Sequence, residues 1–248
     1  VKIIINKQND GYAKGYNNVL SQISAKYYVL INSDIQVTKD WLYPIIRLMD
    51  NDKNISACQP KILDYKNKER FEYAGASGGF IDKYCYPFAR GRIFNTIEND
   101  DGQYDDMKRI FWASGTGFIT RKSIFNELGG FDENLFAHME EIDYHWKCQL
   151  NGYEVYANPK SVIYHLGGGT LSYQSAYKTY LNHRNSLLLL LSNYNFINTI
   201  KFSIIRIMME CISCMKDLVS LRFKHAFAQI NSLLWIIVHP HIIIRRRK

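Results

Sequence analysis

The amino-acid sequence predicts an α/β fold, with a mainly parallel sheet, flanking helices and a C-terminal helical appendage. Short β-branched and aromatic runs at residues 27–31 and 55–58 are typical of buried strands, and a helical pattern lies between them. From residue 173 onward the pattern is helical and increasingly apolar. A chain of 248 residues can bury one α/β domain plus such an appendage. We therefore expect a first domain over residues 1–185 and a basic amphipathic helical tail over residues 186–248.

The N-terminal part alternates between strand and helix patterns. In order, we expect a strand at residues 1–6, a turn at 9–13 that feeds a helix ending near 25, a strand at 27–31, a helix across 41–49 and a strand at 55–58. This alternation predicts parallel strands covered by helices. The strand pattern begins at Val1 itself, and no initiator Met precedes it. We therefore expect a fragment that lacks an N-terminal piece.

Residues 64–108 interrupt this alternation with many glycines, aromatic residues and mixed charges. The segment is too long for an ordinary connection, so we expect a β-rich insertion beside a site. Aromatic faces and guanidinium groups suit sugars and phosphates. The side chains of these kinds in the segment are Tyr84, Tyr86, Phe88, Arg90 and Arg92.

The elements after the insertion follow one another closely. We expect a strand or strand pair at residues 110–119 with a glycine-lined bend that includes Gly115, a short helix at 121–128, an acidic helix at about 139–150, and strands at 153–157 and 162–165. A glycine-rich segment, residues 167–170, comes next. Its glycines fit a plain turn, and its amides could equally face phosphate oxygens.

Three carboxylates, Glu140, Glu141 and Asp143, fall within four residues at the start of the acidic helix. Like-charge repulsion raises the pKa of such groups, whereas the helix N-terminus stabilises their anions, so one of them can titrate nearer neutrality than a free Glu. This is how a general base is formed. A helix start that carries acids only to suit the helix dipole is the alternative interpretation.

Asp34 follows directly after the strand at residues 27–31. In open α/β sheets, ligands bind at the carboxyl ends of strands, and a carboxylate there suits Mg²⁺ or Mn²⁺ bridging a diphosphate. Asp34 could instead cap the next helix, whose start we expect between Thr38 and Trp41.

The formal net charge of +8 is concentrated in the C-terminal part, where residues 196–248 carry nine Lys or Arg against two acidic residues. Apolar stripes alternate there with the basic residues, and no apolar run approaches the length of a membrane-spanning helix. Such segments lie on an anionic membrane surface or pack against a partner, or they simply close against the domain with a solvated basic end. The uneven charge argues against a nucleic-acid-binding face.

Five scattered cysteines show no framework spacing, and we expect a reducing, cytoplasmic environment. The Cys211 and Cys214 pair has a redox spacing but lies in an apolar helical pattern, so we interpret it as packing.

Five segments taken in order resemble the family 2 glycosyltransferases, and most closely the rhamnosyltransferase-like members that build bacterial surface polysaccharides. They are residues 9–17 (NDGYAKGYN), 29–34 (VLINSD), 129–133 (GGFDE), 140–143 (EEID) and 165–168 (HLGG), and the similarity covers roughly residues 1–185. The resemblance implies a GT-A nucleotide-diphospho-sugar transferase fold. It also implies metal-assisted, inverting transfer of a sugar, with rhamnose as a candidate, from a nucleotide-diphosphate donor to a glycan or lipid-linked saccharide. Family members begin with a further strand, helix and strand that this sequence lacks.

The resemblance also implies roles for particular residues. Asp34 becomes the metal ligand for Mn²⁺ or Mg²⁺, and His165 a residue that completes the metal shell. Ser33 would neighbour the ribose or metal, and Asn32 replaces the leading Asp of the family motif. Glu141 falls on the position of the catalytic base, where the family more often has Asp.

Further donor and acceptor contacts are expected around these positions. Glu140 and Asp143 would tune Glu141 and hold acceptor or sugar hydroxyls. Residues 167–170 would close over the donor, and the aromatic and arginine side chains of the 64–108 insertion would contact the acceptor. The remaining candidates for donor or sugar binding are Gly115, Asp132 and Gly168.

The basic tail then fits a lipid-linked acceptor at the cytoplasmic face of the cell membrane, with peripheral contact and no nucleic acid. A non-catalytic nucleotide-sugar-binding or membrane-associated module is the main alternative, favoured by Asn32 in place of Asp. A nucleotidyltransferase is a third possibility, but the chain has no Gly-rich, Lys-bearing phosphate loop.

Overall fold

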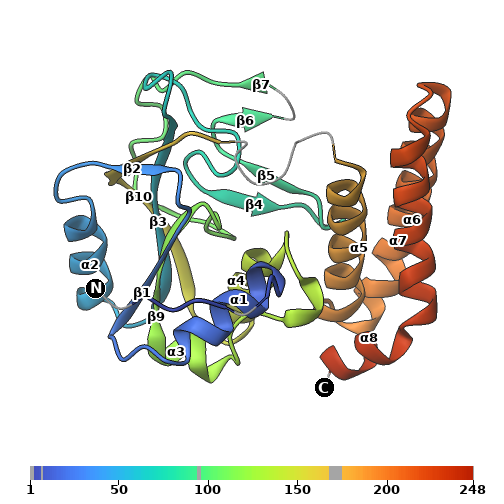
Figure 1. The fold of residues 1–248 in the computed structure, drawn as a ribbon, viewed down its shortest axis with the longest axis horizontal. Helices are drawn as coiled ribbons and strands as arrows, with labels where there is room; N and C mark the ends of the chain where they lie inside the picture. The colour runs from blue at the N-terminus through green and yellow to red at the C-terminus, as the bar shows by residue number, and fades with distance from the viewer. Residues whose placement is uncertain (1–2, 7, 94–95, 168–174, 248) are drawn as a thin grey trace. The chain divides into compact units, whose positions relative to one another are not determined.

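The computed structural model describes residues 3–6, 8–93, 96–167 and 175–247 and divides the chain into two compact units (Figure 1). The sheet unit comprises residues 1–80, 87–136 and 140–169, and the helical unit comprises residues 81–86, 137–139 and 170–248. Helix α5 (Ala176–Asn193) runs through residue 185, where the sequence predicts a domain boundary. Residue 185 marks where the similarity to the family ends, and this position does not coincide with the end of an element.

The elements before residue 170 are short and numerous. The helices are α1 (Gly11–Leu20), α2 (Leu42–Asn51), α3 (Lys122–Glu127), the 3-10 helix η1 (Glu133–Leu135) and α4 (Glu140–Leu150). The strands are β1 (Tyr27–Ile31), β2 (Ile35–Val37), β3 (Ile55–Asp64), β4 (Gly79–Ile81), β5 (Pro87–Ala89), β6 (Arg92–Ile93), β7 (Thr96–Ile97), β8 (Lys108–Arg109), β9 (Gly117–Arg121) and β10 (Glu154–His165).

The main sheet has the strand order β1-β9-β3-β10-β2, with β8 also paired to β10. The α/β class is confirmed, but the sheet is mixed and not mainly parallel. Among the described residues, β3 and β10 form the one parallel pair, and the other pairings are antiparallel. Strands β1 and β3 do run in the same direction, as the strand-helix-strand pattern predicts. They are not neighbours, because β9 lies between them and runs against both.

Several predicted boundaries were wrong. Residues 3–6 form no strand, because no described strand pairs with them. Helix α1 ends at Leu20 and not near residue 25. Residues 110–116 are mostly irregular, and the strand predicted there begins only at Gly117. The two strands predicted at 153–157 and 162–165 are one strand, β10, with an irregularity between Asn158 and Val162.

The predicted β-rich insertion is confirmed. Strands β4, β5, β6 and β7 form a second sheet in that order (Figure 1). Gly79 begins β4 directly against the ring of Trp112, where an added Cβ would lie 2.0 Å from the ring atom Cε2. The indole Nε1 of Trp112 donates to the Phe80 carbonyl at 2.8 Å, so only glycine permits this close contact.

An aromatic core holds α3 and α4 against the main sheet. Phe125 packs edge-on to Tyr28 of β1 and against Tyr144 of α4, with ring centroids 5.7 and 5.2 Å apart. The hydroxyl of Tyr144 is hydrogen-bonded to Thr120 Oγ1 of β9 at 2.7 Å, which satisfies the polar group inside the core. This packing fixes the start of α4, where the predicted acidic cluster lies.

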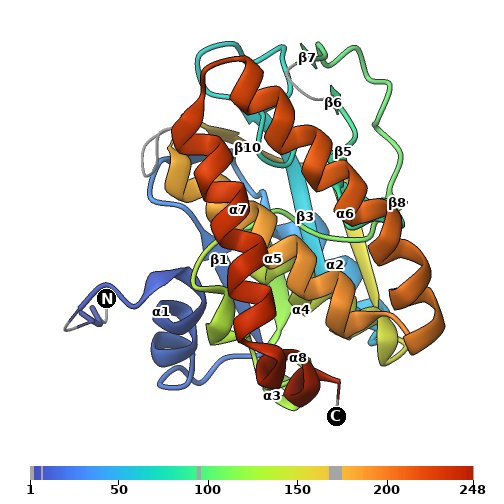
Figure 2. The same ribbon diagram turned by 90° about the vertical axis from the view of Figure 1, so that its right-hand side faces the viewer.

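The helical unit contains α5, α6 (Phe196–Val219), α7 (Phe223–Val238) and α8 (Pro240–Arg246), which pack together (Figure 2). Its centre is a buried guanidinium, Arg206, which donates to Glu210 Oε1 at 2.8 Å and to the Tyr84 carbonyl at 2.6 Å. The guanidinium also lies over the ring of Tyr86, 3.9 Å from its centroid. Arg206 therefore joins residues 81–86 to the helices.

Among the described residues, one bent pair of helices has the length and composition of a membrane span. No single helix of the described chain is long and apolar enough to cross a bilayer, while α7 and α8 together meet the length and composition test with a 68° bend between them.

Candidate active site

Asp34 and His165 lie together at one edge of the main sheet. Strand β2 pairs with the end of β10 in a register that places His165 opposite Ile35. This register brings Asp34 Oδ1 to 3.2 Å from His165 Nε2. The Leu166 backbone N–H also donates to the Asp34 carbonyl at 3.0 Å, so backbone and side chains fix the same contact. Asn32 is part of the group, with Nδ2 3.4 Å from His165 Nε2.

Glu72 contacts the second ring nitrogen of the imidazole. The sequence pattern did not identify Glu72 as a site residue. Its Oε1 lies 3.2 Å from His165 Nδ1, and its Oε2 accepts the Ala74 backbone N–H at 2.6 Å. Burial opposes protonation of His165, but the neighbouring Glu72 and Asp34 carboxylates outweigh it and raise the pKa of the imidazole. A carboxylate on Nδ1 leaves Nε2 facing Asp34, and such a partner orients a metal-binding His.

The donor set fits a divalent ion that takes its remaining ligands from a substrate. Among the described residues, no group of three or more His, Cys, Asp or Glu side chains is arranged to hold a metal by itself. Asp34 and His165 offer one carboxylate and one imidazole, a combination that suits Mn²⁺. Ions at diphosphate sites commonly use one or two protein carboxylates, with phosphate oxygens and waters completing the shell.

Glu141 begins α4 beside the Gly115 bend. A Cβ built on Gly115 would lie 3.5 Å from Glu141 Oε1 and 3.4 Å from the Tyr12 hydroxyl. The bend predicted from its glycines is therefore a place where a carboxylate approaches the backbone closely. Residues just before α4 have positive φ angles, including His138 at 66° and Met139 at 73°. Strained backbone of this kind gathers at functional sites.

Glu140 and Glu141 are neighbouring carboxyls with different environments. Burial raises the pKa of Glu140 well above its ordinary value, and the Glu141 charge raises it further. Burial also raises the pKa of Glu141, but backbone N–H groups, including that of Gly115, stabilise its anion and limit the rise. Glu140 therefore holds a proton more tightly, and Glu141 is the carboxyl that ionises first.

The segment from Ala113 to Gly117 connects the two groups. The Asn32 backbone N–H donates to the Thr116 carbonyl at 3.0 Å, and the Tyr12 hydroxyl donates to the Gly115 carbonyl at 3.0 Å. Glu141 and Asn32 are thus bonded to adjacent residues of one segment, Gly115 and Thr116. His145, one helical turn after Glu141, accepts the Ala113 backbone N–H at Nδ1 at 3.3 Å.

Burial lowers the pKa of His145 to about 3, which keeps this acceptor neutral. Neither Tyr12 nor His145 was singled out from the sequence. Each stands in an apolar helical pattern, where the residue type alone points to packing.

Of three further predicted site residues, two are bound within their own segment and one is exposed. Asp132 Oδ1 accepts the Asn134 backbone N–H at 2.9 Å and so caps η1. Asp143 is fully buried and forms an ion pair with Lys147 at 2.8 Å, so its predicted contact with acceptor hydroxyls is not supported. It lies about 200° around the helix from Glu141. Ser33 is exposed next to Asp34. Gly168 and most of the segment 167–170 lie outside the described residues.

The predicted acceptor side chains of the insertion do not form one set. Tyr84 and Tyr86 belong to the helical unit, where they contact Arg206. Arg90 belongs to the sheet unit and pairs with Asp106 at 2.7 Å. Phe88 is half exposed and stacks on Phe80.

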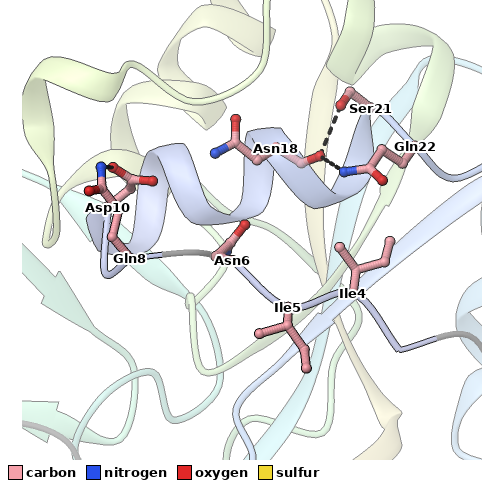
Figure 3. A pocket seen from close by; sticks show the side chains of 8 residues that line it. All are labelled: Ile4, Ile5, Asn6, Gln8, Asp10, Asn18, Ser21 and Gln22. Atoms are coloured by element: carbon pink, nitrogen blue, oxygen red, sulfur yellow. Dashed lines mark hydrogen bonds between the residues drawn. The ribbon is translucent and has the colours of Figure 1, made fainter.

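A hollow of about 640 Å³ opens between the N-terminal segment and α1 (Figure 3). Its walls are mostly short polar side chains, and its lining residues are Ile4, Ile5, Asn6, Gln8, Asp10, Asn18, Ser21 and Gln22. None of the predicted site residues lines it. The hollow is therefore separate from both the Asp34–His165 contact and the Glu141 carboxyl.

Comparison with known proteins gives a consistent result. The sequence profile described as glycosyl transferase family 2 matches residues 1–129, about half of the chain. The chain is 22% identical over 189 residues to the low-salt glycan biosynthesis hexosyltransferase Agl10 of Haloferax volcanii, a match covering 73% of this chain and 57% of that protein.

A second relative is the N-acetylglucosaminyl-diphospho-decaprenol L-rhamnosyltransferase of Mycobacterium tuberculosis. It is 28% identical over 85 residues, which covers 34% of this chain and 28% of that protein. The chain spans between 22% and 57% of the length of the curated relatives that it matches.

Among solved structures, the crystal structure of GalNAc-T7 with UDP, GalNAc and Mn²⁺ superposes with a TM-score of 0.54 at 14% sequence identity. The superposition covers 81% of this chain and 42% of that chain. At this level of identity the likeness supports the GT-A fold predicted from the sequence.

Proposed function

Because the chain belongs to glycosyl transferase family 2, we propose that it transfers a sugar from a nucleotide-diphosphate donor to an acceptor hydroxyl with inversion at the anomeric carbon. The observation that carries this proposal is the environment of Glu141. This carboxyl has a raised pKa, a less acidic neighbour in Glu140, and a place beside a backbone bend that also contacts the Asn32 segment. Those are the properties of a general base set next to a binding edge.

In this reaction Glu141 takes the proton from the attacking acceptor hydroxyl while that oxygen bonds to the anomeric carbon. The bond from the anomeric carbon to the diphosphate oxygen breaks on the opposite face, so a single displacement inverts the configuration. Glu140 keeps its proton and so adds no second negative charge beside the base. The Gly115 N–H and the helix N-terminus hold the Glu141 carboxylate in place before it reacts.

Asp34 and His165 would hold the divalent ion, with Glu72 orienting the imidazole. When bound, Mn²⁺ or Mg²⁺ would stabilise the negative charge that develops on the leaving diphosphate. The GalNAc-T7 structure contains Mn²⁺ together with UDP, which supports Mn²⁺ as the first ion to test.

The donor sugar and the acceptor follow from the relatives alone. The rhamnosyltransferase named above supports rhamnose as a candidate and a lipid-diphosphate-linked saccharide as the acceptor class. Such an acceptor lies at a membrane, so we place the enzyme in the cytoplasm, peripherally at the inner face of the cell membrane.

The Glu141→Gln variant tests this function. We expect its rate of nucleoside-diphosphate release, measured with Mn²⁺ across a panel of nucleotide sugars and acceptors, to fall by at least about a hundredfold. Donor binding, followed by thermal shift, should be unchanged because the amide keeps the shape of the side chain. The control is Glu69→Gln, which removes the same charge from an exposed position.

A Glu141→Gln variant that turns over at the wild-type rate would rule out the base assignment. Donor binding without release or transfer by the wild-type chain, over the whole panel, would favour a non-catalytic binding module.

A further inference from the structure

Helix α6 has its polar and apolar faces reversed. Its four buried side chains are all polar, namely Thr199, Arg206, Glu210 and Asp217. Its exposed large apolar side chains are Phe196, Ile197, Ile200, Ile204, Ile205, Ile207, Met208, Ile212, Met215 and Val219. A helix that faces water has the opposite arrangement.

The exposed apolar residues of α6 form one stripe along the helix. Ile197, Ile200, Ile204 and Met208 follow one another at intervals of three and four residues, the spacing that places side chains on one face. The exposed fraction of the Ile204 side chain is 61%, and that of Ile212 is 67%. A large contiguous apolar patch on the surface of a folded protein marks an interaction surface.

Helix α7 repeats the pattern beside α6. Its buried residues are small or polar, namely Ala226, Ala228, Gln229 and Ser232. Its exposed large residues are Phe223, Phe227, Ile230, Leu234, Ile237 and Val238. Small and polar residues between helices, with apolar residues outside, are typical of helices that contact lipid. We call the exposed apolar residues of α6 and α7 the outward face.

The charged residues of these helices are also divided between the two faces, with the acidic side chains buried and lysines exposed. Residues 196–248 contain only two acidic residues, Glu210 and Asp217, and both are buried. Glu210 is bonded to Arg206 and His183, and Asp217 Oδ2 accepts from Gln229 at 2.7 Å. Lys201, Lys216 and Lys224 are exposed. In the described part of α6 and α7, the outward face is therefore bordered by cations and contains no carboxylate.

We propose that the outward face is the docking surface for an anionic phospholipid bilayer, with α6 and α7 lying in the headgroup region and the apolar stripe in the acyl boundary. Each exposed Lys adds attraction to the negative surface. A second copy of the chain fits less well, because a symmetric contact would bring the same cations together. The inference extends the peripheral location proposed above by naming its surface and its lipid class.

Vesicle flotation with the full chain tests the apolar part of the proposal. We expect binding to vesicles of phosphatidylcholine with phosphatidylglycerol. The double variant Ile204→Gln with Ile212→Gln should lower the partition coefficient by roughly tenfold or more, because two apolar side chains that would enter the acyl boundary are lost. The control Leu150→Gln changes an apolar side chain of matched exposure, 63%, on α4 of the sheet unit and should bind like the wild type. Circular dichroism and thermal unfolding confirm that the variants fold.

A second pair of variants tests the charge. Lys201→Gln and Lys216→Gln should each weaken binding to the anionic vesicles roughly fivefold. Vesicles of phosphatidylcholine alone should bind the wild type weakly, and the two variants should match it there.

Three outcomes would overturn the proposal. They are equal binding by wild type and the double isoleucine variant, equal binding to neutral and anionic vesicles, and absence of vesicle binding together with a dimer, by light scattering, that the isoleucine variant abolishes. Flotation requires no donor or turnover, so its failure is distinct from a failure of the transfer reaction.

Discussion

At the residue scale, the site is determined by what surrounds each carboxyl and imidazole more than by which residue types are present. Glu140 and Glu141 are adjacent and chemically identical, yet the Gly115 backbone N–H stabilises the Glu141 anion, while the Glu141 charge disfavours the Glu140 anion. His165 and His145 are both buried. His165 lies between two carboxylates, and His145 meets a backbone N–H and a phenyl ring. The first is a candidate metal ligand, and the second positions the 113–117 segment.

The Glu140→Gln variant should change how stability depends on pH. The folded-state pKa of Glu140 is raised, so its stabilising contribution is fully present below the ordinary Glu pKa of 4.5 and is lost as pH rises through the raised value. Gln stays neutral throughout. We expect wild type and variant to unfold alike near pH 4 and the variant to be more stable at neutral pH, by on the order of 1 kcal/mol.

Calorimetry from acid to neutral pH measures this difference, with exposed Glu69→Gln as the control. A stability difference that stays constant with pH would contradict the burial argument for Glu140.

Glu72→Gln should weaken metal binding without touching the ion's expected ligands. Gln can still accept the Ala74 N–H, but it lacks the charge that holds His165 through Nδ1. Loss of such an orienting partner typically costs about tenfold or more in affinity. Titration calorimetry with Mn²⁺ and a nucleoside diphosphate measures the change. Glu141→Gln is the matched control and should keep the wild-type affinity, and an unchanged affinity in Glu72→Gln would remove Glu72 from the site.

At the scale of elements, the sequence predicted those helices and strands whose formation depends on local residue periodicity. The helices α2 and α4, the strand β1 and the β-rich insertion all follow from periodicity and turn residues. Strands β2 and β8 have only three and two residues, too few to show a period, and pairing with β10 alone makes them strands.

The site divides in the same way. Asp34 lies just before β2, Glu141 lies in the first turn of α4, and His165 ends β10, so the sequence pattern could point to all three. Glu72 has no local signature, because the bridge between Leu63 and Phe71 brings it to the site from within the insertion.

Arg206→Leu should destabilise the helical unit. The substitution leaves the buried Glu210 carboxylate without its guanidinium and frees the Tyr84 carbonyl, so we expect a loss of about 3–5 kcal/mol in the free energy of unfolding. Arg222→Leu, which removes an exposed guanidinium 3.4 Å from Asp217, should cost less than about 1 kcal/mol. Urea denaturation compares them. Equal losses in the two variants would show that the buried cluster is not the anchor of residues 81–86.

At the scale of the whole molecule, composition and structure divide the chain into a nearly neutral sheet-containing part and a cationic helical part. The sequence showed where the charge lies, but it could not show that Glu210 and Asp217 point inward while the isoleucines point outward. That reversal appears only when the helices are packed. The packing role predicted for Cys211 was wrong, because this residue is exposed.

The position of β9 has a consequence for how the chain is made. Strands β1 and β3 are synthesised before the strand that lies between them, which is complete only at Arg121, and before the parallel partner of β3, which is complete only at His165. Pairings that join such distant residues have a high contact order and form slowly. Strands β1 and β3 therefore lack β9 until Arg121 has been synthesised, and aggregation or chaperone capture would act on the nascent protein at this stage.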